Sequence, residues 1–285
     1  MPKYKLQKFV RSESPLGHLR IQPRDIALLQ DLASFRFLNS AQIMALHPGG
    51  KRNLQRRLHR LYHLGYVERP EAQREIVLAS NNLVYALGRK GAEVAFGEER
   101  AVRNWSRLNA RIKSPNLAHA LMVSQFRTIL TLALKKRGGE ITRWRQGHDL
   151  RGELTIRGKS PEIVPDGFFT IKQDDKQWHF FLEADRGSMD HHRFLGKMRA
   201  YWNWYCEKTY NAHLNFQSFR VLTITNTEGR RDNLCATTKS ADARRTGSGL
   251  FLFVCEKDYS LKKPEAVLSP IWLSAKDESK HSLFE

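Results

Sequence analysis

Residues 116–255 alternate between helical and strand patterns, and this alternation limits the possible folds more than any other feature. A helical pattern at 116–136 is followed by β-rich runs at 140–144, 163–171 and 178–185, and then by helix, strand, helix and strand at 190–210, 219–225, 229–240 and 250–255. Interspersed helices and strands pack as helices on the faces of a sheet. The order αβββαβαβ therefore predicts an α/β domain with a mixed central sheet.

The preceding part of the chain has shorter helical patterns. One begins at Gln22-Pro23, a second is capped by Asn39 or Ser40 and ends at Pro48-Gly49-Gly50, and a third runs over 51–64. Runs at 66–68, 75–78 and 83–87 follow and predict a small β-hairpin. Three helices and a hairpin predict an N-terminal winged helix-turn-helix. The expected organisation is a flexible basic arm at 1–20, this domain at 21–106, a linker at 107–115, the α/β domain at 116–270 and a C-terminal tail at 271–285.

The third helix separates its side chains by type. Its leucines recur on one face, which we expect to pack against its own domain, and cationic side chains occupy much of the rest. Guanidinium groups on an outward face can contact phosphates and guanine edges in the major groove of DNA. The expected DNA-contact residues are Lys51, Arg52, Gln55, Arg56 and Arg60. The alternative is an ordinary solvated basic helix in a protein-interaction module.

Net charge supports a polyanionic partner. The 285 residues include 48 Lys and Arg against 29 Asp and Glu, a formal charge of +19. Residues 1–113 carry 21 basic and 9 acidic side chains, a net +12, so the excess is concentrated in the first part. No run approaches the roughly 18 consecutive apolar residues of a membrane span. These features predict a cytoplasmic protein that binds double-stranded DNA and has no membrane partner.

Carboxylates interrupt the apolar strand at 178–185. Glu183 and Asp185 are two residues apart, so their side chains share one face of the strand at roughly 7 Å. If the strand that carries Asp166 pairs with this one, three carboxylates converge as hard oxygen ligands for Mg²⁺ or Mn²⁺. On the next helix, Lys197 lies four residues before Tyr201, so both can face the same cleft. A lysine there would stabilise the charge on a scissile phosphate.

These motifs resemble two related groups of proteins. Asp166 after a proline, with Glu183-x-Asp185 on the next strand, resembles the PD-(D/E)xK restriction-endonuclease-like superfamily. More narrowly, RRLHRLYHLGYVER, then PDG, LEADRG and a helix reading K-x3-Y, are similar to the replication-relaxation family of plasmid and other mobile-element proteins. The resemblance covers roughly residues 20–210 and implies a role in plasmid replication and in relaxation of plasmid DNA.

The resemblance also implies roles for single residues. Asp166 and Glu183 match the superfamily's metal-binding carboxylates, while Asp185 stands where that motif has lysine. Either Lys197 replaces that lysine from the adjacent helix, or the site is inactive. The corresponding catalytic set is Asp166, Glu183, Asp185 and Lys197, with the three carboxylates as metal ligands.

Three functions therefore stay open. The first is a DNA endonuclease or nickase that depends on Mg²⁺ or Mn²⁺, and the second is a non-enzymatic DNA-binding factor, either a replication accessory protein or a transcriptional regulator. The third, a relaxase with Tyr201 as nucleophile, lacks the expected histidine triad of metal ligands. Other replication or mobilisation proteins are candidate partners, and a palindromic target would require a homodimer.

Overall fold

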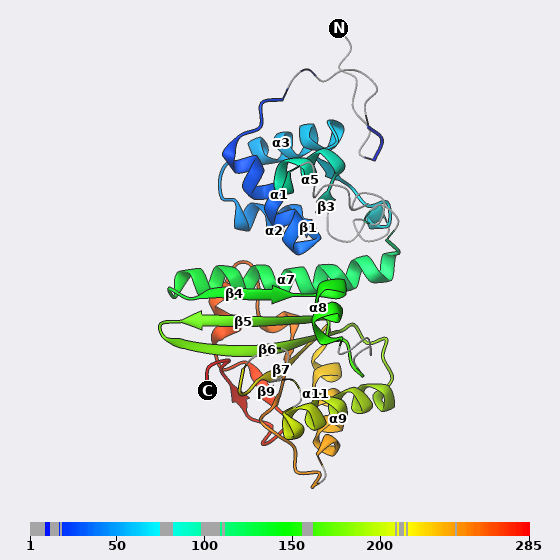
Figure 1. The fold of residues 1–285 in the computed structure, drawn as a ribbon, viewed down its shortest axis with the longest axis vertical. Helices are drawn as coiled ribbons and strands as arrows, with labels where there is room; N and C mark the ends of the chain where they lie inside the picture. The colour runs from blue at the N-terminus through cyan, green and yellow to red at the C-terminus, as the bar shows by residue number, and fades with distance from the viewer. Residues whose placement is uncertain are drawn as a thin grey trace. The chain divides into compact units, whose positions relative to one another are not determined.

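The computed structural model describes residues 9–11, 17, 19–74, 82–97, 109, 112–155, 162–208, 210, 214, 216–242 and 244–285. The chain divides into two compact units, Met1–Thr128 and Ile129–Glu285 (Figure 1). The expected arm at 1–20 lies largely outside the described residues, and the expected linker at 107–115 does so in part, while its last two residues begin helix α7 (Ser114–Lys136). Each unit has a hydrophobic core of its own.

The first unit combines short helices with a three-stranded antiparallel sheet in the order β1-β3-β2. Its elements are α1 (Pro23–Phe35), β1 (Phe37–Asn39), α2 (Ser40–Leu46), α3 (Lys51–His63), β2 (Val67–Glu68), β3 (Val84–Leu87) and α5 (Arg89–Phe96). Proline stands in the first turn of α1, and the Asn39 side chain accepts hydrogen bonds from the first turn of α2. These start signals explain why α1 and α2 were predictable from the sequence.

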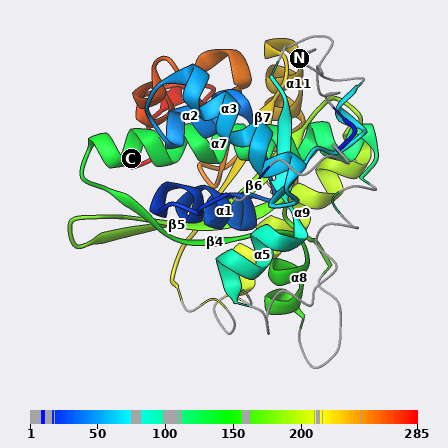
Figure 2. The same cartoon turned by 90° about the horizontal axis from the view of Figure 1, so that it is seen from above.

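Two elements of the first unit were not predicted. β1 has only three residues, too few to show a period, and α5 has only two turns. Figure 2 shows α1 and α5 side by side. Gly91 permits the close approach of α5 to the turn after α3, since a Cβ there would lie 2.1 Å from the Tyr66 carbonyl oxygen. The expected strand at 75–78 lies outside the described residues.

The second unit is built on a seven-stranded sheet in the order β10-β9-β8-β7-β6-β5-β4. Its elements are β4 (Glu140–Arg145), α8 (Gly147–Leu154), β5 (Gly167–Gln173), β6 (Lys176–Asp185), α9 (His191–Glu207), β7 (Arg220–Thr225), α11 (Glu228–Thr238), β8 (Phe251–Cys255), β9 (Trp272–Ser274) and β10 (Lys280–His281). β6, β7 and β8 are parallel, and the other neighbours are antiparallel. The predicted α/β class with a mixed sheet is confirmed.

Two helices connect the parallel strands. α9 joins β6 to β7, α11 joins β7 to β8, and the two helices pack against each other (Figure 1). α9 packs on the face of the sheet to which Phe181 points, and its Tyr201 ring lies 5.5 Å from the Phe181 ring, centroid to centroid. Because strand side chains alternate, Glu183 and Asp185 point to this same helix-covered face.

The C-terminal residues correct one prediction. Residues 271–285 were expected to form a tail, but β9 pairs with β8 and β10 pairs with β9. Trp272 is fully buried, and its indole donates a 2.8 Å hydrogen bond to the Val267 carbonyl. Strands of two or three residues carry no readable alternation, and α8 was missed for a similar reason of length.

Helix α7 (Ser114–Lys136) crosses the division between the units. Of the described helices it alone is long and apolar enough to span a membrane by length and composition. Its Leu117 is fully buried beside Phe37, Val84 and Ala86 of the first unit. Buried helices in the cores of soluble proteins meet the same length and composition criteria.

Candidate functional site

Strand β6 places two carboxylates in the interior of the second unit. The relative exposures of Glu183 and Asp185 are 3% and 5%. Across the parallel pairing they lie opposite Thr223 and Thr225 of β7. A buried carboxylate is costly unless hydrogen bonds or cations compensate it, so the partners of each one determine what it can do.

Glu183 is held by two side chains of α9. Lys197 Nζ donates to one carboxylate oxygen and the Tyr201 hydroxyl to the other, both at 2.5 Å. Lys197 and Tyr201 are four residues apart, so they project from one face of the helix, as the sequence predicted. Tyr201 is fully buried, and a relaxase nucleophile would have to reach the DNA. Tyr201 therefore serves here as a donor to Glu183.

Asp166 lies beside Glu183 because β5 and β6 pair antiparallel. Gly167 is the partner of Leu182, which puts Asp166 next to Glu183 in the register. The Asp166 amide donates to the Leu182 carbonyl at 3.0 Å, and its carboxylate accepts from the Ala184 amide at 2.8 Å. Asp166, Glu183 and Lys197 thus converge at one place on the sheet.

The electrostatics of this cluster are dominated by burial. Burial raises the pKa of Glu183 to about 7, and the charge of Asp166 adds to the increase, although Lys197 opposes it. Burial lowers the pKa of Lys197, but the charges of Glu183 and Asp166 outweigh this, so its pKa is raised overall. A raised pKa of Glu183 disfavours the ion pair, whereas a raised pKa of Lys197 favours it. Because Glu183 is the more deeply buried partner, burial sets the direction for this pair and raises the pKa of Glu183 to near neutral pH.

Asp185 belongs to a different arrangement. Arg230 of α11 donates to both of its carboxylate oxygens, at 2.8 and 2.9 Å, and the Gly187 amide donates at 2.7 Å. The expected convergence of Asp185 with Asp166 and Glu183 is therefore wrong in this structure. Within the described ranges, no three His, Cys, Asp or Glu side chains are grouped to hold a metal ion.

The remaining pair of carboxylates still suits a hard cation. Mg²⁺ in proteins is usually bound through one or two carboxylates, with water and substrate phosphate completing its shell. Asp166 and Glu183 supply two such oxygen donors on adjacent strands. The cluster therefore offers two carboxylates to such an ion, not the three expected from the sequence, and both oxygens of Glu183 already accept hydrogen bonds.

The first unit presents the predicted basic helix. Leu54, Leu58 and Leu61 of α3 are buried in its core, which leaves the opposite face outward. Of the predicted DNA-contact residues, Lys51, Arg52, Gln55 and Arg56 are exposed and Arg60 is partly exposed. Four of these five residues carry positive charge, so α3 presents a cationic surface.

Arg57 differs from its neighbours on α3. It forms an ion pair with Asp25 of α1, which is only 3% exposed, and it also donates to the Arg20 carbonyl at 2.7 Å. Asp25 in turn accepts from the Gln22 amide at 2.8 Å. Arg57 therefore fixes α3 against the start of α1, and it is not one of the predicted DNA-contact residues.

Sequence reasoning missed Arg230. It is 45 residues from Asp185 and lies on a mostly polar helix, so no local spacing links the two. Tyr201 did carry a signal, the four-residue spacing from Lys197, but its bond to Glu183 became visible only in the structure.

The chain thus combines a basic helix in one unit with a carboxylate–lysine cluster in a mixed α/β unit. Residues 29–218 match the replication-relaxation family, about two thirds of the chain, and the protein belongs to that family. The match includes α3, Asp166, Glu183 and Lys197, and it ends before Arg230. Comparisons with curated proteins and with solved structures gave no significant match.

Proposed function

We propose that the protein binds duplex DNA through its first unit and nicks DNA at the Asp166–Glu183–Lys197 cluster of its second unit. The proposal refines the family's association with replication and relaxation of plasmids or other mobile elements. The observation that carries it is the convergence of two carboxylates and a lysine from β5, β6 and α9. The first unit would act as a winged helix, with α3 in the major groove.

Each member of the cluster has a chemical task in phosphodiester cleavage. Lys197, with its raised pKa, stays cationic and can stabilise the negative charge that develops on the attacked phosphate. Glu183 can accept or supply a proton near neutral pH because its pKa is about 7. Tyr201 fixes the orientation of Glu183 and stays protonated, since burial and the nearby carboxylate raise its pKa. An Mg²⁺ or Mn²⁺ ion held by Asp166 and Glu183 would neutralise charge on the scissile phosphate, and it would keep Glu183 deprotonated, so the pKa of about 7 applies to the site before such an ion is bound.

A second candidate is a DNA-binding factor without catalytic activity. Two observations favour it: Asp185 replaces the lysine of the nuclease motif and is held by Arg230, and both oxygens of Glu183 already accept hydrogen bonds. In that case the second unit would serve as a binding or dimerisation platform. The two candidates share the duplex-binding role of α3 and differ only in cleavage.

Supercoiled plasmid distinguishes the two candidates. The full chain is incubated with plasmid in Mg²⁺, in Mn²⁺ and in chelator, beside the variants Asp166→Asn and Glu183→Gln. We expect divalent-dependent nicking by the parent and at least a hundredfold slower nicking by both variants, as for loss of a general acid–base or electrostatic group. Lys136→Met, which removes a surface ion pair with Glu265 in the same unit, is the control and should nick like the parent. Equal nicking by parent and site variants, or none by the parent, would exclude the enzymatic candidate.

A further inference from the structure

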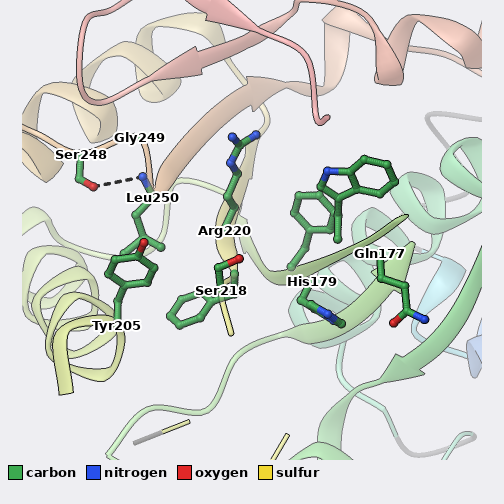
Figure 3. A pocket seen from close by; sticks show the side chains of 11 residues that line it. Gln177, His179, Tyr205, Ser218, Arg220, Ser248, Gly249 and Leu250 are labelled. Carbon is green, nitrogen blue, oxygen red and sulfur yellow. Dashed lines mark hydrogen bonds between the residues drawn. The ribbon is translucent and has the colours of Figure 1, made fainter. Parts of the chain in front are cut away.

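A pocket lies at the opposite end of β6 from Glu183. It has a volume of about 410 Å³, which is within the usual ~300–1,000 Å³ of ligand pockets. The beginnings of β6 and β7, the segment before β8 and one residue of α9 line it (Figure 3). It is separate from the carboxylate cluster, because His179 and Glu183 are four residues apart along β6, roughly 13 Å.

The pocket contains a cation, Arg220, that is held by few direct contacts. Arg220 lies between Tyr205 and His179 (Figure 3), and it is partly buried. Its guanidinium donates to the Leu283 carbonyl at 3.3 Å, and within the described part of the chain it forms no salt bridge. A guanidinium has five N–H donors, so most of them remain for a ligand. Burial lowers the pKa of Arg220, and the charge of Glu285 opposes this only in part.

Aromatic side chains form the walls around Arg220. Tyr205 is 38% exposed, whereas Tyr201, one turn earlier on α9, is fully buried in the core. The Tyr205 ring lies 5.7 Å from Phe219 and 6.3 Å from Trp202, which keeps its orientation fixed while one side faces solvent. Burial lowers the pKa of His179, so its ring is neutral at neutral pH and adds no charge. Ser218 and Ser248 add hydroxyl groups to the lining.

We infer that this pocket binds one nucleotide of single-stranded DNA, with Arg220 on its phosphate and Tyr205 against its base. Aromatic rings beside a cationic groove are the general means of holding unpaired bases and their backbone, since every base offers a stacking face. Lys197, Tyr201 and Tyr205 recur at four-residue spacing on one face of α9. That helix therefore connects the proposed cleavage cluster with the proposed strand-binding pocket. The inference rests on the proposed function, because nicking or melting a duplex supplies the unpaired strand.

Binding of a short oligonucleotide tests the inference directly. Fluorescence anisotropy with a labelled oligothymidylate of about 8 nucleotides, inside the usual site sizes for single strands, is measured on the full chain. We expect Tyr205→Ala and Arg220→Met each to weaken binding about tenfold, the order of effect of one stacked base or one lost phosphate contact. Arg220→Lys keeps the positive charge but not the planar guanidinium, so we expect it to weaken binding less than Arg220→Met does. Thermal melting identifies any variant that fails to fold.

Phe96→Ala is the matched control for Tyr205→Ala. Phe96 is also an aromatic residue 38% exposed, but it lies on α5 of the first unit, so its removal should leave oligonucleotide binding unchanged. Oligonucleotide affinity that is the same in the parent, Tyr205→Ala and Arg220→Met would overturn the inference. If the parent still binds duplex DNA and nicks plasmid, that result overturns the inference about the pocket but not the proposed function.

Competition identifies the source of the nucleotide. Thymidine monophosphate is added as a competitor to the parent and to Tyr205→Ala, each with bound oligonucleotide. If it displaces the oligonucleotide from the parent but not from the variant, the pocket binds a nucleotide, either free or within a strand. Displacement only by longer oligonucleotides supports the strand alone. Inorganic phosphate that competes as well as thymidine monophosphate would contradict a role for the aromatic wall. A parent that binds neither duplex nor single strand would overturn this inference together with the proposed function.

Discussion

Two ion pairs lie side by side in the second unit, and they differ in how completely the cation and its neighbours compensate the buried carboxylate. In Glu183–Lys197 the side chains are 4% and 16% exposed, and in Asp185–Arg230 they are 4% and 14% exposed. Arg230 binds Asp185 through both oxygens and Gly187 adds a backbone donor, so that carboxylate is fully compensated. Lys197 and Tyr201 each give Glu183 one bond, while nearby Asp166 raises its pKa. Equal burial therefore produces a structural pair in one case and a proton-exchanging group in the other.

The largest effect on stability is expected for Arg230→Met. Asp185 would remain buried without its cation, and breaking a buried pair in this way costs about 3–5 kcal/mol. Urea denaturation at neutral pH measures the loss, and tryptophan fluorescence reports mainly on the second unit, which holds five of the six tryptophans. Lys136→Met, on an exposed pair, should unfold close to the parent. A small loss for Arg230→Met would mean that Asp185 is not dependent on Arg230.

The pH dependence of stability should come from Glu183. Its pKa is about 7 in the folded chain against 4.5 ordinarily, so between these values the folded state holds a proton that the unfolded state has released. Stability from this group is therefore lost as the pH rises from 4.5 to 7, by about 3 kcal/mol at most. The unfolding free energy of the parent minus that of Glu183→Gln should therefore fall over that range. Asp185→Asn keeps Glu183, so the same difference between Asp185→Asn and Glu183→Gln should also fall. A difference that stays constant with pH would contradict the raised pKa.

Lys197→Met should destabilise less than Arg230→Met. Without the lysine, Glu183 can take up a proton because burial already favours its neutral form, so we expect a loss of about 1–2 kcal/mol below pH 7. The loss should grow above pH 7, where keeping that proton becomes costly. Urea denaturation at two pH values, with Arg230→Met alongside, measures both effects. Equal losses at all pH values in the two variants would remove the distinction between the pairs.

The adjacent residues Arg56 and Arg57 should differ in which property of the protein their removal changes. Arg56 is exposed, so Arg56→Ala should weaken duplex binding and lower the slope of log K against log salt by about 1 if it contacts a phosphate. Arg57→Ala should instead lower the unfolding temperature, because it leaves Asp25 buried without its cation. Lys262→Ala, an exposed cation of the second unit, is the control. An unchanged affinity and slope for Arg56→Ala would favour a protein-interaction role for α3.

Much of the architecture and part of the site were readable from the sequence. Helices with a start signal and a full apolar period, such as α1, α3 and α9, were placed within a few residues of their bounds. The spacing of Lys197 and Tyr201 also placed them on a common face toward Glu183. Local periodicity, however, reports which side chains share a face and says nothing of distant partners.

The missed features depend on sheet order and on very short elements. Arg230 reaches Asp185 because β6 and β7 are parallel neighbours, with α11 following β7, and this arrangement is set by packing over many residues. A predicted cluster of three carboxylates therefore became two carboxylates and one ion pair. β1, β9 and β10 escaped prediction because three residues or fewer cannot display a period.

The central claim is that Glu183 acts chemically while Asp185 acts structurally. The most direct measurement is the rate of divalent-dependent plasmid nicking by Glu183→Gln and Asp185→Asn, compared at a temperature where both variants are folded. These substitutions remove equally buried carboxylates two residues apart and preserve side-chain size. We predict that Glu183→Gln loses at least a hundredfold in rate, whereas Asp185→Asn stays within a few-fold of the parent. Equal losses in the two variants, or a loss in Asp185→Asn alone, would contradict the account.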